Sequence, residues 1–435
     1  MYDKSVVQSP GRPFCRPVIG QRSPTPTDGV RCKDSAAFTK DSSCSHRTTF
    51  AEAIRTVRYT DAFMALDYPY PAHPEPGTTI EVAEGVRWLT MPMGGSLNHI
   101  NLYLLEDDDG WFVVDTGLAT SETKRLWHMV FENEMGGKPV KGVICTHMHP
   151  DHVGQAGMIV NHFRCPLYMT RAEYYQARSF MTMGMSAAKG GWLGEQFYHR
   201  YGMSMAPMHS MRDAWKSRAK TPARTPEDTP DPLPMGYHRL EDGDLLTIGD
   251  HDWQVVVGAG HSPEHACLHC HSLGIMISGD QILPVITSNV SVHPTEPEAN
   301  PLKIWMESHD KFLDTPERTF VLPAHNLPFY GVRERLRDLI GHHEDRMLAI
   351  EEFCVEPKTA KDMLPVLFRR KLDARQTMMA LGEAIAHCHL LMHRNRLKRT
   401  LEEDGRYRFL AIDPDLDRRA HPGRHDAPDD APIMV

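Results

Sequence analysis

The chain has 435 residues, of which 41% are hydrophobic and 24% charged, and its formal net charge is −9 at pH 7. This balance is typical of a globular protein with room for two or three domains, and the negative charge argues against a surface that binds polyanions throughout. Nine cysteines without regular spacing disfavour a secreted disulfide scaffold. Neither a membrane-spanning apolar run nor a secretory signal is visible, so we expect a cytoplasmic protein that does not contact membranes.

The two ends of the chain differ in composition from its middle. Residues 1–55 are rich in Ser, Thr, Pro and Arg without hydrophobic periodicity, and residues 413–435 are polar and Pro-rich. Both compositions predict disorder. The middle begins with β-prone runs and a helical pattern in alternation, which predicts strands over 79–91, 100–105, 111–114 and 138–146 and a helix over 120–133. This alternation indicates a layered α/β domain over residues 78–330.

An insertion interrupts the strand pattern over about residues 171–235. It is rich in Met, Trp and Tyr and then in Pro and Thr, so we expect helices followed by a surface loop. Met is a flexible apolar residue, and the insertion could be a lid over an acyl or aromatic substrate or could simply pack as helices. The strand pattern then resumes over 237–248, 253–258 and 275–278, with a further strand expected around 266–272.

After residue 330 the pattern becomes helical. We expect helices over 332–355, 359–368 and 374–395, followed by two β-prone runs on either side of Asp404-Gly405 within 396–412. Such a turn between β-prone runs predicts a hairpin. Three helices followed by a hairpin is the order of a winged helix, so the sequence predicts a winged-helix-like C-terminal domain over 331–412.

The residues with the clearest chemistry follow the strand predicted over 138–146. The sequence THMHPDH places His147, His149, Asp151 and His152 within a short loop. Neutral imidazole and carboxylate are ligands that Zn²⁺, Fe²⁺ and Mn²⁺ accept. One ion could bind the two alternate histidines and a second could bind Asp151 and His152. Two ions about 3.5–4 Å apart polarise a substrate and deprotonate a bridging water.

The HxHxDH pattern resembles the signature of the metallo-β-lactamase superfamily, and other motifs of that family stand in the expected order. They are Asp115 in VVDTG, His261 in GAGHSPEH, Asp280 in ISGDQILP and His325 in LPAHNLPF. The resemblance covers residues 78–330. It implies an α/β protein with the αββα sandwich of that family, and the helical end of the chain is similar to the winged-helix extension of the lactamase-β-2-like branch.

The resemblance also implies a role for each of these residues. The first metal ion would bind His147, His149 and His261. The second would bind Asp151, His152 and His325, and Asp280 would bridge both ions. The water between the ions would be the nucleophile, Asp151 would handle its proton, and Asp115 would support the ligand loop. We expect two divalent ions, with zinc favoured and iron or manganese as alternatives.

Three further residues are weaker candidates. His265 stands four residues after His261, where it could orient a ligand or be an ordinary loop residue. Ser288 and Asn289 fall where related enzymes often line the substrate cleft. His149 itself favours hydrolysis, because the oxygen-reducing diiron relatives carry Glu at that position.

The leading hypothesis is a hydrolase of a small thioester or ester, similar to hydroxyacylglutathione hydrolases. The alternatives are a lactonase or β-lactamase, an iron-dependent persulfide dioxygenase, a non-catalytic DNA-binding protein and an endoribonuclease acting on single-stranded RNA. The RNA hypothesis depends on the C-terminal segment, where residues 358–408 contain twelve basic and six acidic side chains. A basic winged helix can contact phosphates, although charged helix faces are more often simply solvated. A homodimer is also compatible with the sequence.

Overall fold

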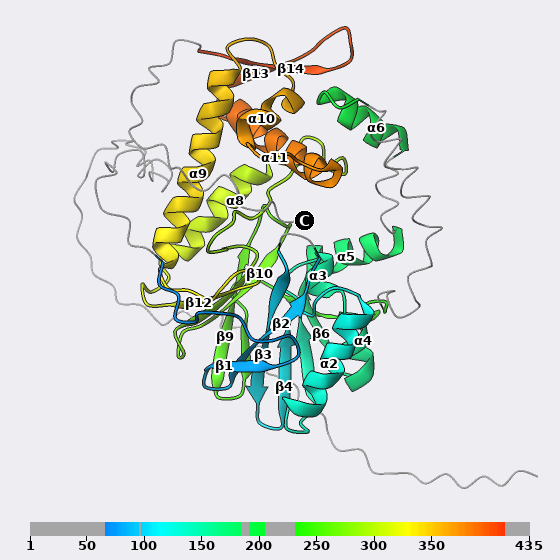
Figure 1. Cartoon of the computed structure of the whole chain (residues 1–435), viewed down its shortest axis with the longest axis vertical. Helices are drawn as coiled ribbons and strands as arrows, with labels where there is room; N and C mark the ends of the chain where they lie inside the picture. Colours follow the sequence, from blue (N-terminus) through cyan, green and yellow to red (C-terminus); the bar gives the residue numbers. More distant parts are fainter. Residues whose placement is uncertain (1–65, 95–96, 184–190, 205–230, 414–435) are drawn as a thin grey trace, which may run out of the picture.

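The computed structural model describes residues 66–94, 97–183, 191–204 and 231–413 (Figure 1). The lead-in predicted over 1–55 and nearly all of the predicted tail lie outside these residues, as do Met185, Met205, Met208, Met211 and Trp215 of the insertion. Packed structure begins before residue 78, because the backbone of Asp67 pairs with that of Tyr330. None of the helices within the described ranges combines the length and the apolar character needed to cross a membrane.

Seven strands form the first sheet in the order of the sequence. They are β1 (Thr79–Ala83), β2 (Val86–Pro92), β3 (His99–Asp107), β4 (Gly110–Val114), β5 (Val140–Ile144), β6 (Leu167–Thr170) and β7 (His238–Leu240). Strands β1 to β4 pair antiparallel, and β4 to β7 pair parallel. Parallel neighbours need long crossover connections, and the helices between β4 and β7 provide them.

The second sheet has five strands in the order β12-β11-β10-β9-β8. They are β8 (Leu245–Ile248), β9 (His251–Gly258), β10 (His265–Cys270), β11 (Ile275–Gly279) and β12 (Phe320–Pro323). The expected strand around residues 266–272 is therefore present as β10. Strands β8 to β11 are antiparallel, whereas β11 and β12 are parallel and are joined through α8 (Pro301–His309) and the 3₁₀ helix η3 (Asp310–Phe312).

The two sheets pack face to face between two layers of helices (Figure 1). Residues of both sheets, among them Trp88, Tyr103 and Trp253, form the core between them. The outer face of the first sheet packs against α2 (Ser121–Asn133), α4 (Ala156–Phe163) and α5 (Arg171–Met183), and the outer face of the second packs against α8, α9 (Val332–Phe353) and α11 (Ala374–His393). This is the predicted αββα sandwich.

The C-terminal region contains the predicted order of helices and hairpin. Helix α9 is followed by the 3₁₀ helix η4 (Ala360–Met363), α10 (Leu364–Leu367), α11 and the hairpin of β13 (Leu397–Leu401) and β14 (Tyr407–Ala411). The continuous helix expected over 359–368 is wrong in detail. Proline fits only the first turn of a helix, so the chain starts a new short helix around Pro365. The comparison of this region with a winged helix stays a prediction.

Part of the insertion is also helical, as expected. It contributes α5 and α6 (Gly191–Arg200). Helix α6 lies beside the C-terminal region (Figure 1), where His199 contacts the carbonyl of Asp404 and Tyr201 contacts His389. The insertion thus begins on the first sheet and continues to the C-terminal helices.

Candidate metal centre

The predicted ligands all come from loops at one end of the two sheets. His147 follows β5, and the loop then enters the short helix α3 (Pro150–Val153), whose first turn carries Asp151 and His152. His261 lies between β9 and β10, Asp280 follows β11, and His325 follows β12. Because parallel strands end at the same edge of a sheet, β11 and β12 deliver Asp280 and His325 side by side.

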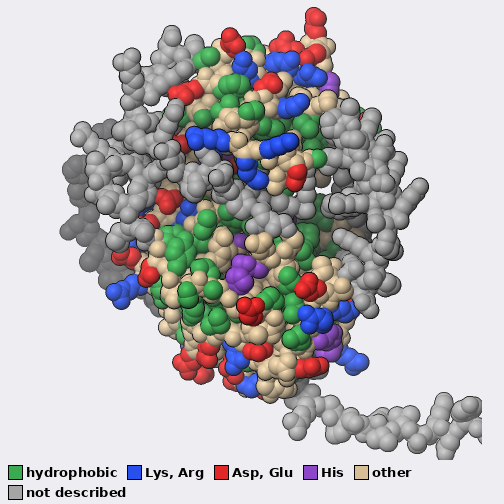
Figure 2. Space-filling view, viewed as in Figure 1, with side chains coloured by type: hydrophobic (Ala, Val, Ile, Leu, Met, Phe, Trp, Pro, Cys, Tyr) green, Lys and Arg blue, Asp and Glu red, His purple; other side chains and the backbone are tan. Residues whose placement is uncertain are grey.

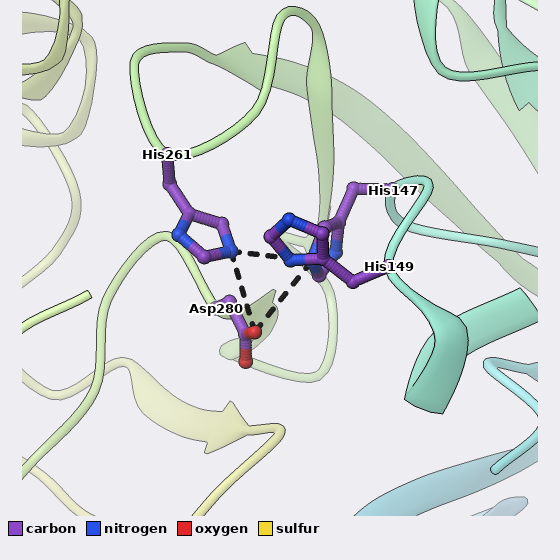
Figure 3. Close-up of side chains that lie close together, drawn as sticks. All are labelled: His147, His149, His261 and Asp280. Carbon is purple, nitrogen blue, oxygen red and sulfur yellow. Dashed lines mark hydrogen bonds and ion pairs between the residues drawn. The ribbon is translucent and has the colours of Figure 1, made fainter. Parts of the chain in front are cut away.

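Four of these residues form a first ligand group (Figure 3). His147 Nε2 lies 2.9 Å from His149 Nδ1 and 3.2 Å from His261 Nε2. Asp280 Oδ2 lies 3.5 Å from His147 Nε2 and 3.4 Å from His261 Nε2. The ligand atoms of the four side chains therefore point toward one shared space.

A second ligand group shares Asp280 with the first. His152 Nε2 lies 3.3 Å from Asp280 Oδ2, and His325 Nε2 lies 3.4 Å from Asp280 Oδ1. Asp151 Oδ2 lies 3.6 Å from His152 Nε2 and 3.5 Å from His325 Nε2. One carboxylate thus faces both groups, which is the arrangement that a pair of bridged ions needs.

The chemistry and spacing of these atoms fit metal ions. A tetrahedral ion about 2.0–2.1 Å from each ligand holds its ligand atoms about 3.3 Å apart, close to the spacings in both groups. His152 Nε2, His325 Nε2 and both carboxylate oxygens of Asp280 are buried without a hydrogen-bond partner. Unpaired buried polar atoms are costly, and a bound cation would satisfy all four.

Burial controls the protonation of the first group. It lowers the pKa of His147 well below the ordinary value, and the neighbouring His152 and His149 lower it further. Burial, together with His261, also lowers the pKa of His149 to about 3. Both rings are therefore neutral at physiological pH, which is the form of imidazole that binds metal.

Opposite charges lie close together around Asp280, the carboxylate that belongs to both groups. Burial alone would raise the pKa of Asp280, but His152 and His325 beside it hold that pKa well below the ordinary value. Burial alone would lower the pKa of His152, but Asp115, Asp280 and Asp151 raise it well above the ordinary value. The neighbouring carboxylates and imidazoles thus favour each other's charged forms.

Asp115 supports the ligand loop from behind. Its carboxylate accepts hydrogen bonds from His152 Nδ1 at 2.7 Å and from the backbone N–H and the hydroxyl of Thr146, both at 2.8 Å. The backbone of Asp115 has a φ of +59°, a left-handed conformation that Asp and Asn tolerate better than other side chains. These contacts fix the ring of His152 with Nε2 toward the second group.

Backbone groups orient the other ligands. The Nδ1 of His261 contacts the carbonyl of Asn289 at 2.8 Å, and the Nδ1 of His325 contacts that of His99 at 3.2 Å. His265 accepts a hydrogen bond from the backbone N–H of Asp280 at 3.0 Å, so this candidate contacts the bridging residue rather than lying in a remote loop.

Ser288 and Asn289 also lie next to the ligands. Besides the contact of Asn289 with His261, the Ser288 hydroxyl donates to the backbone carbonyl of Asp280. Ser288 is fully buried. That either residue lines a substrate cleft stays a prediction. In the space-filling view, histidine side chains reach the surface near the centre of the face shown, between the C-terminal helices and the sandwich (Figure 2).

Glu173 is a supporting residue that the sequence did not single out. It lies in the first turn of α5 and is completely buried. Its Oε2 accepts from the backbone N–H of Met148 at 2.9 Å, and its Oε1 accepts from that of Glu264 at 2.8 Å. Glu173 therefore ties the HxHxDH loop to the loop that carries His261. An acidic residue in the first turn of a helix is common, so its position gave no distinctive signal.

Two family models match the chain. The model of the metallo-beta-lactamase superfamily matches residues 95–325, more than half of the 435 residues, and the model of the metallo-beta-lactamase-like C-terminal domain matches residues 347–412. The first match spans all the residues of the two ligand groups. The second spans the C-terminal end of α9, then η4, α10, α11 and the hairpin.

Solved structures and curated proteins also resemble the chain. The crystal structure of a beta-lactamase domain protein from Burkholderia ambifaria is 39% identical, covers 80% of this chain and 98% of its own, and has a TM-score of 0.71. A metallo-beta-lactamase family protein from Thermus thermophilus is 25% identical, covers 76% of this chain and 99% of its own, and has a TM-score of 0.61. The acyl-coenzyme A thioesterase MBLAC2 of Bos taurus is 22% identical over 46% of this chain and 64% of its own length.

The chain spans between about half and two thirds of the first curated relatives that it matches, 48% of an uncharacterised Aquifex aeolicus protein and 64% of the bovine thioesterase. The match to the superfamily model, the sandwich fold and the likeness to the Burkholderia structure all agree. The chain therefore belongs to the metallo-β-lactamase superfamily.

Proposed function

We propose that this protein is a dinuclear metal-dependent hydrolase that cleaves a small thioester or ester. The observation that carries the proposal is the pair of ligand groups joined by Asp280. When bound there, two divalent ions, zinc in the first place and iron or manganese as alternatives, would polarise the substrate carbonyl and lower the pKa of a water molecule.

The residues of the chain have separate tasks in this proposal. Asp280 fixes the two groups relative to each other, and Asp115 and the carbonyl of Asn289 hold the rings of His152 and His261 in place. Asp151 is the proposed proton acceptor, because its carboxylate lies in the second group and its side chain remains 10% exposed. Proton transfer requires such a group within hydrogen-bond reach of the reacting water.

Relatives support a thioester or ester substrate. The bovine relative is named as an acyl-coenzyme A thioesterase, and a relative from Maricaulis maris that is 29% identical over 86 residues is named as a hydroxyacylglutathione hydrolase. Both names describe cleavage of an acyl group from a sulfur atom. We extend this reaction class, and not either particular substrate, to the present chain.

Exposed apolar side chains on α5 and α6 also support an acyl substrate. Tyr175 and Phe180 on α5 are 59% and 41% exposed, and Trp192 and Leu193 on α6 are 69% and 58% exposed. Helix α5 starts beside the ligand loop, because Glu173 contacts Met148. We propose that these side chains contact the acyl part of the substrate.

The ion pairs of the C-terminal region disfavour the endoribonuclease alternative. At least six of the twelve basic residues counted there pair with acidic side chains. The pairs are Lys358 with Glu356, Arg394 with Glu344, Arg396 with Glu351, Arg399 with Glu298, and both Arg406 and Arg408 with Asp404. Neutralised charges contribute less to phosphate binding.

The complete second ligand group likewise favours two ions over the single iron of a persulfide dioxygenase.

A substrate panel tests the proposal. Zinc-loaded protein is assayed with acyl thioesters of coenzyme A and of glutathione, aryl esters, lactones, a β-lactam and single-stranded RNA. Because zinc has no redox chemistry, oxygen uptake with a persulfide is followed separately on iron-loaded protein. We expect the highest kcat/KM for a thioester or an ester and no turnover in the Asp280→Ala variant. Cleavage of RNA alone, oxygen uptake, or undiminished activity of Asp280→Ala would contradict the proposal.

A further inference from the structure

The loop of residues 288–292 contacts two ligands of the first group. The hydroxyl of Ser288 donates to the carbonyl of Asp280, and the carbonyl of Asn289 lies 2.8 Å from His261 Nδ1. The orientation of the His261 ring therefore depends on where the backbone of Asn289 is held. What holds that backbone is consequently part of the metal centre.

The other side of this loop is attached to α11 of the C-terminal region. Asn289 Nδ2 donates to Glu383 Oε2 at 3.3 Å, and the backbone N–H of Val292 donates to the carbonyl of Gly382 at 3.1 Å. The Ser291 hydroxyl donates to Asn289 Oδ1 at 2.7 Å and lies 3.2 Å from the carbonyl of Met379. Both ends of the Asn289 amide are thus fixed, one of them by a side chain of α11.

Close packing leaves this interface little freedom. A Cβ atom added at Gly382 would lie 2.8 Å from Ser291 Cβ, so helix and loop approach each other more closely than any larger side chain would permit. Glu383 is only 6% exposed. Glutamate is almost never buried unless it is paired, and the side-chain hydrogen bond from Asn289 gives Glu383 a polar partner.

We propose that Glu383 is a positioning residue for the first metal ion: through Asn289 it holds the carbonyl that orients His261. The C-terminal region would then set the affinity of the first ligand group, in addition to covering the second sheet. This inference rests on the proposed metal centre but is independent of the substrate. Without Glu383 the amide of Asn289 loses one anchor, and His261 loses its fixed orientation.

The conservative variant of Glu383 should preserve this arrangement. Burial raises the pKa of Glu383 to about 7, against the lowering effect of Arg346, so a protonated carboxyl is close in energy to the ionised one. Glutamine has nearly the same shape as the protonated form and keeps an oxygen that accepts from Asn289. Glu383→Gln is therefore a rescue variant, and Glu383→Ala removes the acceptor.

The test is a zinc titration of the purified full chain in competition with a chromophoric chelator, which gives two dissociation constants. Loss of a residue that orients a ligand typically weakens metal binding about 10–100-fold. We expect Glu383→Ala to raise one dissociation constant about ten-fold and to leave the other within about three-fold, and we expect Glu383→Gln to match the wild type. Asn289→Ala should reproduce Glu383→Ala without altering α11, and the double variant should add nothing further.

Glu351→Gln is the matched control. Glu351 is a buried carboxylate of the same helical region, 3% exposed on α9, but it pairs with Arg396 and not with the ligand loops. This variant should lose stability and keep both zinc constants. Unchanged constants in folded Glu383→Ala and Asn289→Ala, or an equal rise in Glu351→Gln, would overturn the role of Glu383 alone. A wild type that binds no zinc would overturn the metal centre together with this inference.

Discussion

The molecule contains two groups of buried histidines with different properties. One is the candidate metal centre around Asp280. The other, the helical histidine group, consists of His309, His343 and His387 between α8, α9 and α11. In each of these three rings, one nitrogen contacts a neighbouring residue within the helices. His309 contacts the carbonyl of Trp305, His387 contacts that of Glu383, and His343 contacts His387.

The difference between the two groups is the presence of carboxylates. At the metal centre, Asp280 and Asp151 lie among the imidazoles, and ligand atoms of four side chains converge in each ligand group. In the helical histidine group, burial lowers the pKa of His309 and His387 to about 4, so these rings are neutral. Among the described residues, only the two groups around Asp280 bring together three or more His, Cys, Asp or Glu side chains that could hold one metal ion. Buried histidines alone therefore do not identify a metal site.

The largest expected effect is that of Asp280→Asn, because this carboxylate belongs to both ligand groups. We expect loss of tightly bound metal and a fall in kcat/KM well beyond the roughly 100-fold that loss of a supporting residue costs. Elemental analysis and steady-state kinetics measure the two quantities. The matched variant His343→Gln should keep its metal, and an equal loss of metal in both variants would remove the distinction between the groups.

A smaller effect is expected for Asp115→Asn. Asparagine tolerates the left-handed backbone at this position, so the fold should survive while the negative charge beside His152 is lost. We expect weakening of the second zinc site by about 10–100-fold, measured by chelator competition. Wild-type affinity in this variant would show that Thr146 and the backbone alone can orient His152.

Glu173→Gln should affect stability more than chemistry. One of its oxygens becomes an amide N–H that faces a backbone N–H, so one buried donor loses its acceptor. We expect the free energy of unfolding to fall by about 1–3 kcal/mol, with a modest rise in zinc dissociation constants. Urea unfolding of the zinc-loaded protein provides the measurement, and a stability equal to the wild type would exclude the proposed link between the two loops.

The helical histidine group should respond to pH and not to metal. Burial lowers the folded-state pKa of His309 to about 4, while the unfolded value is about 6.5. The unfolded chain therefore binds more protons between these values, so this contribution to stability is present above about pH 6.5 and is lost as the pH falls toward 4. Urea unfolding is measured at a series of pH values from 7 to 4. The free energy of unfolding should fall less steeply with pH in His309→Gln than in the wild type. Identical slopes would contradict the neutral buried state.

Local sequence patterns predicted most of the sandwich. The helix over 120–133 and the strands around 79–91, 111–114 and 138–146 appear as α2, β1 with β2, β4 and β5. Helix α2 buries residues at helical spacing, whereas β4 and β5 are short apolar runs that are buried almost throughout. The helix over 359–368 appears as the 3₁₀ helix η4 followed directly by the short helix α10, because Pro365 fits only the first turn of a helix. Pairing of strands far apart in the sequence, such as β6 with β7 across the insertion, has no local signal.

The candidate ligands were predictable because they stand in short motifs, whereas only some of the residues that support them were. Asp115 came from the family resemblance and His265 from its spacing. Three other supports were missed: Glu173 accepts from the backbone N–H of Met148, the backbone carbonyl of His99 contacts the ring of His325, and Glu383 accepts from the Asn289 side chain. Backbone carbonyls have no signature in a sequence, and Glu383 lies 94 residues from Asn289. Only the folded chain brings them together.

Metal content tests the central claim most directly. Purified, folded wild-type protein is dialysed without chelator and analysed for zinc, iron and manganese per chain. We predict about two divalent ions per chain in the wild type and loss of both in Asp280→Asn, since one carboxylate joins both ligand groups. A folded wild type that holds no ion after loading with excess metal, or Asp280→Asn protein that still holds two, would contradict the account.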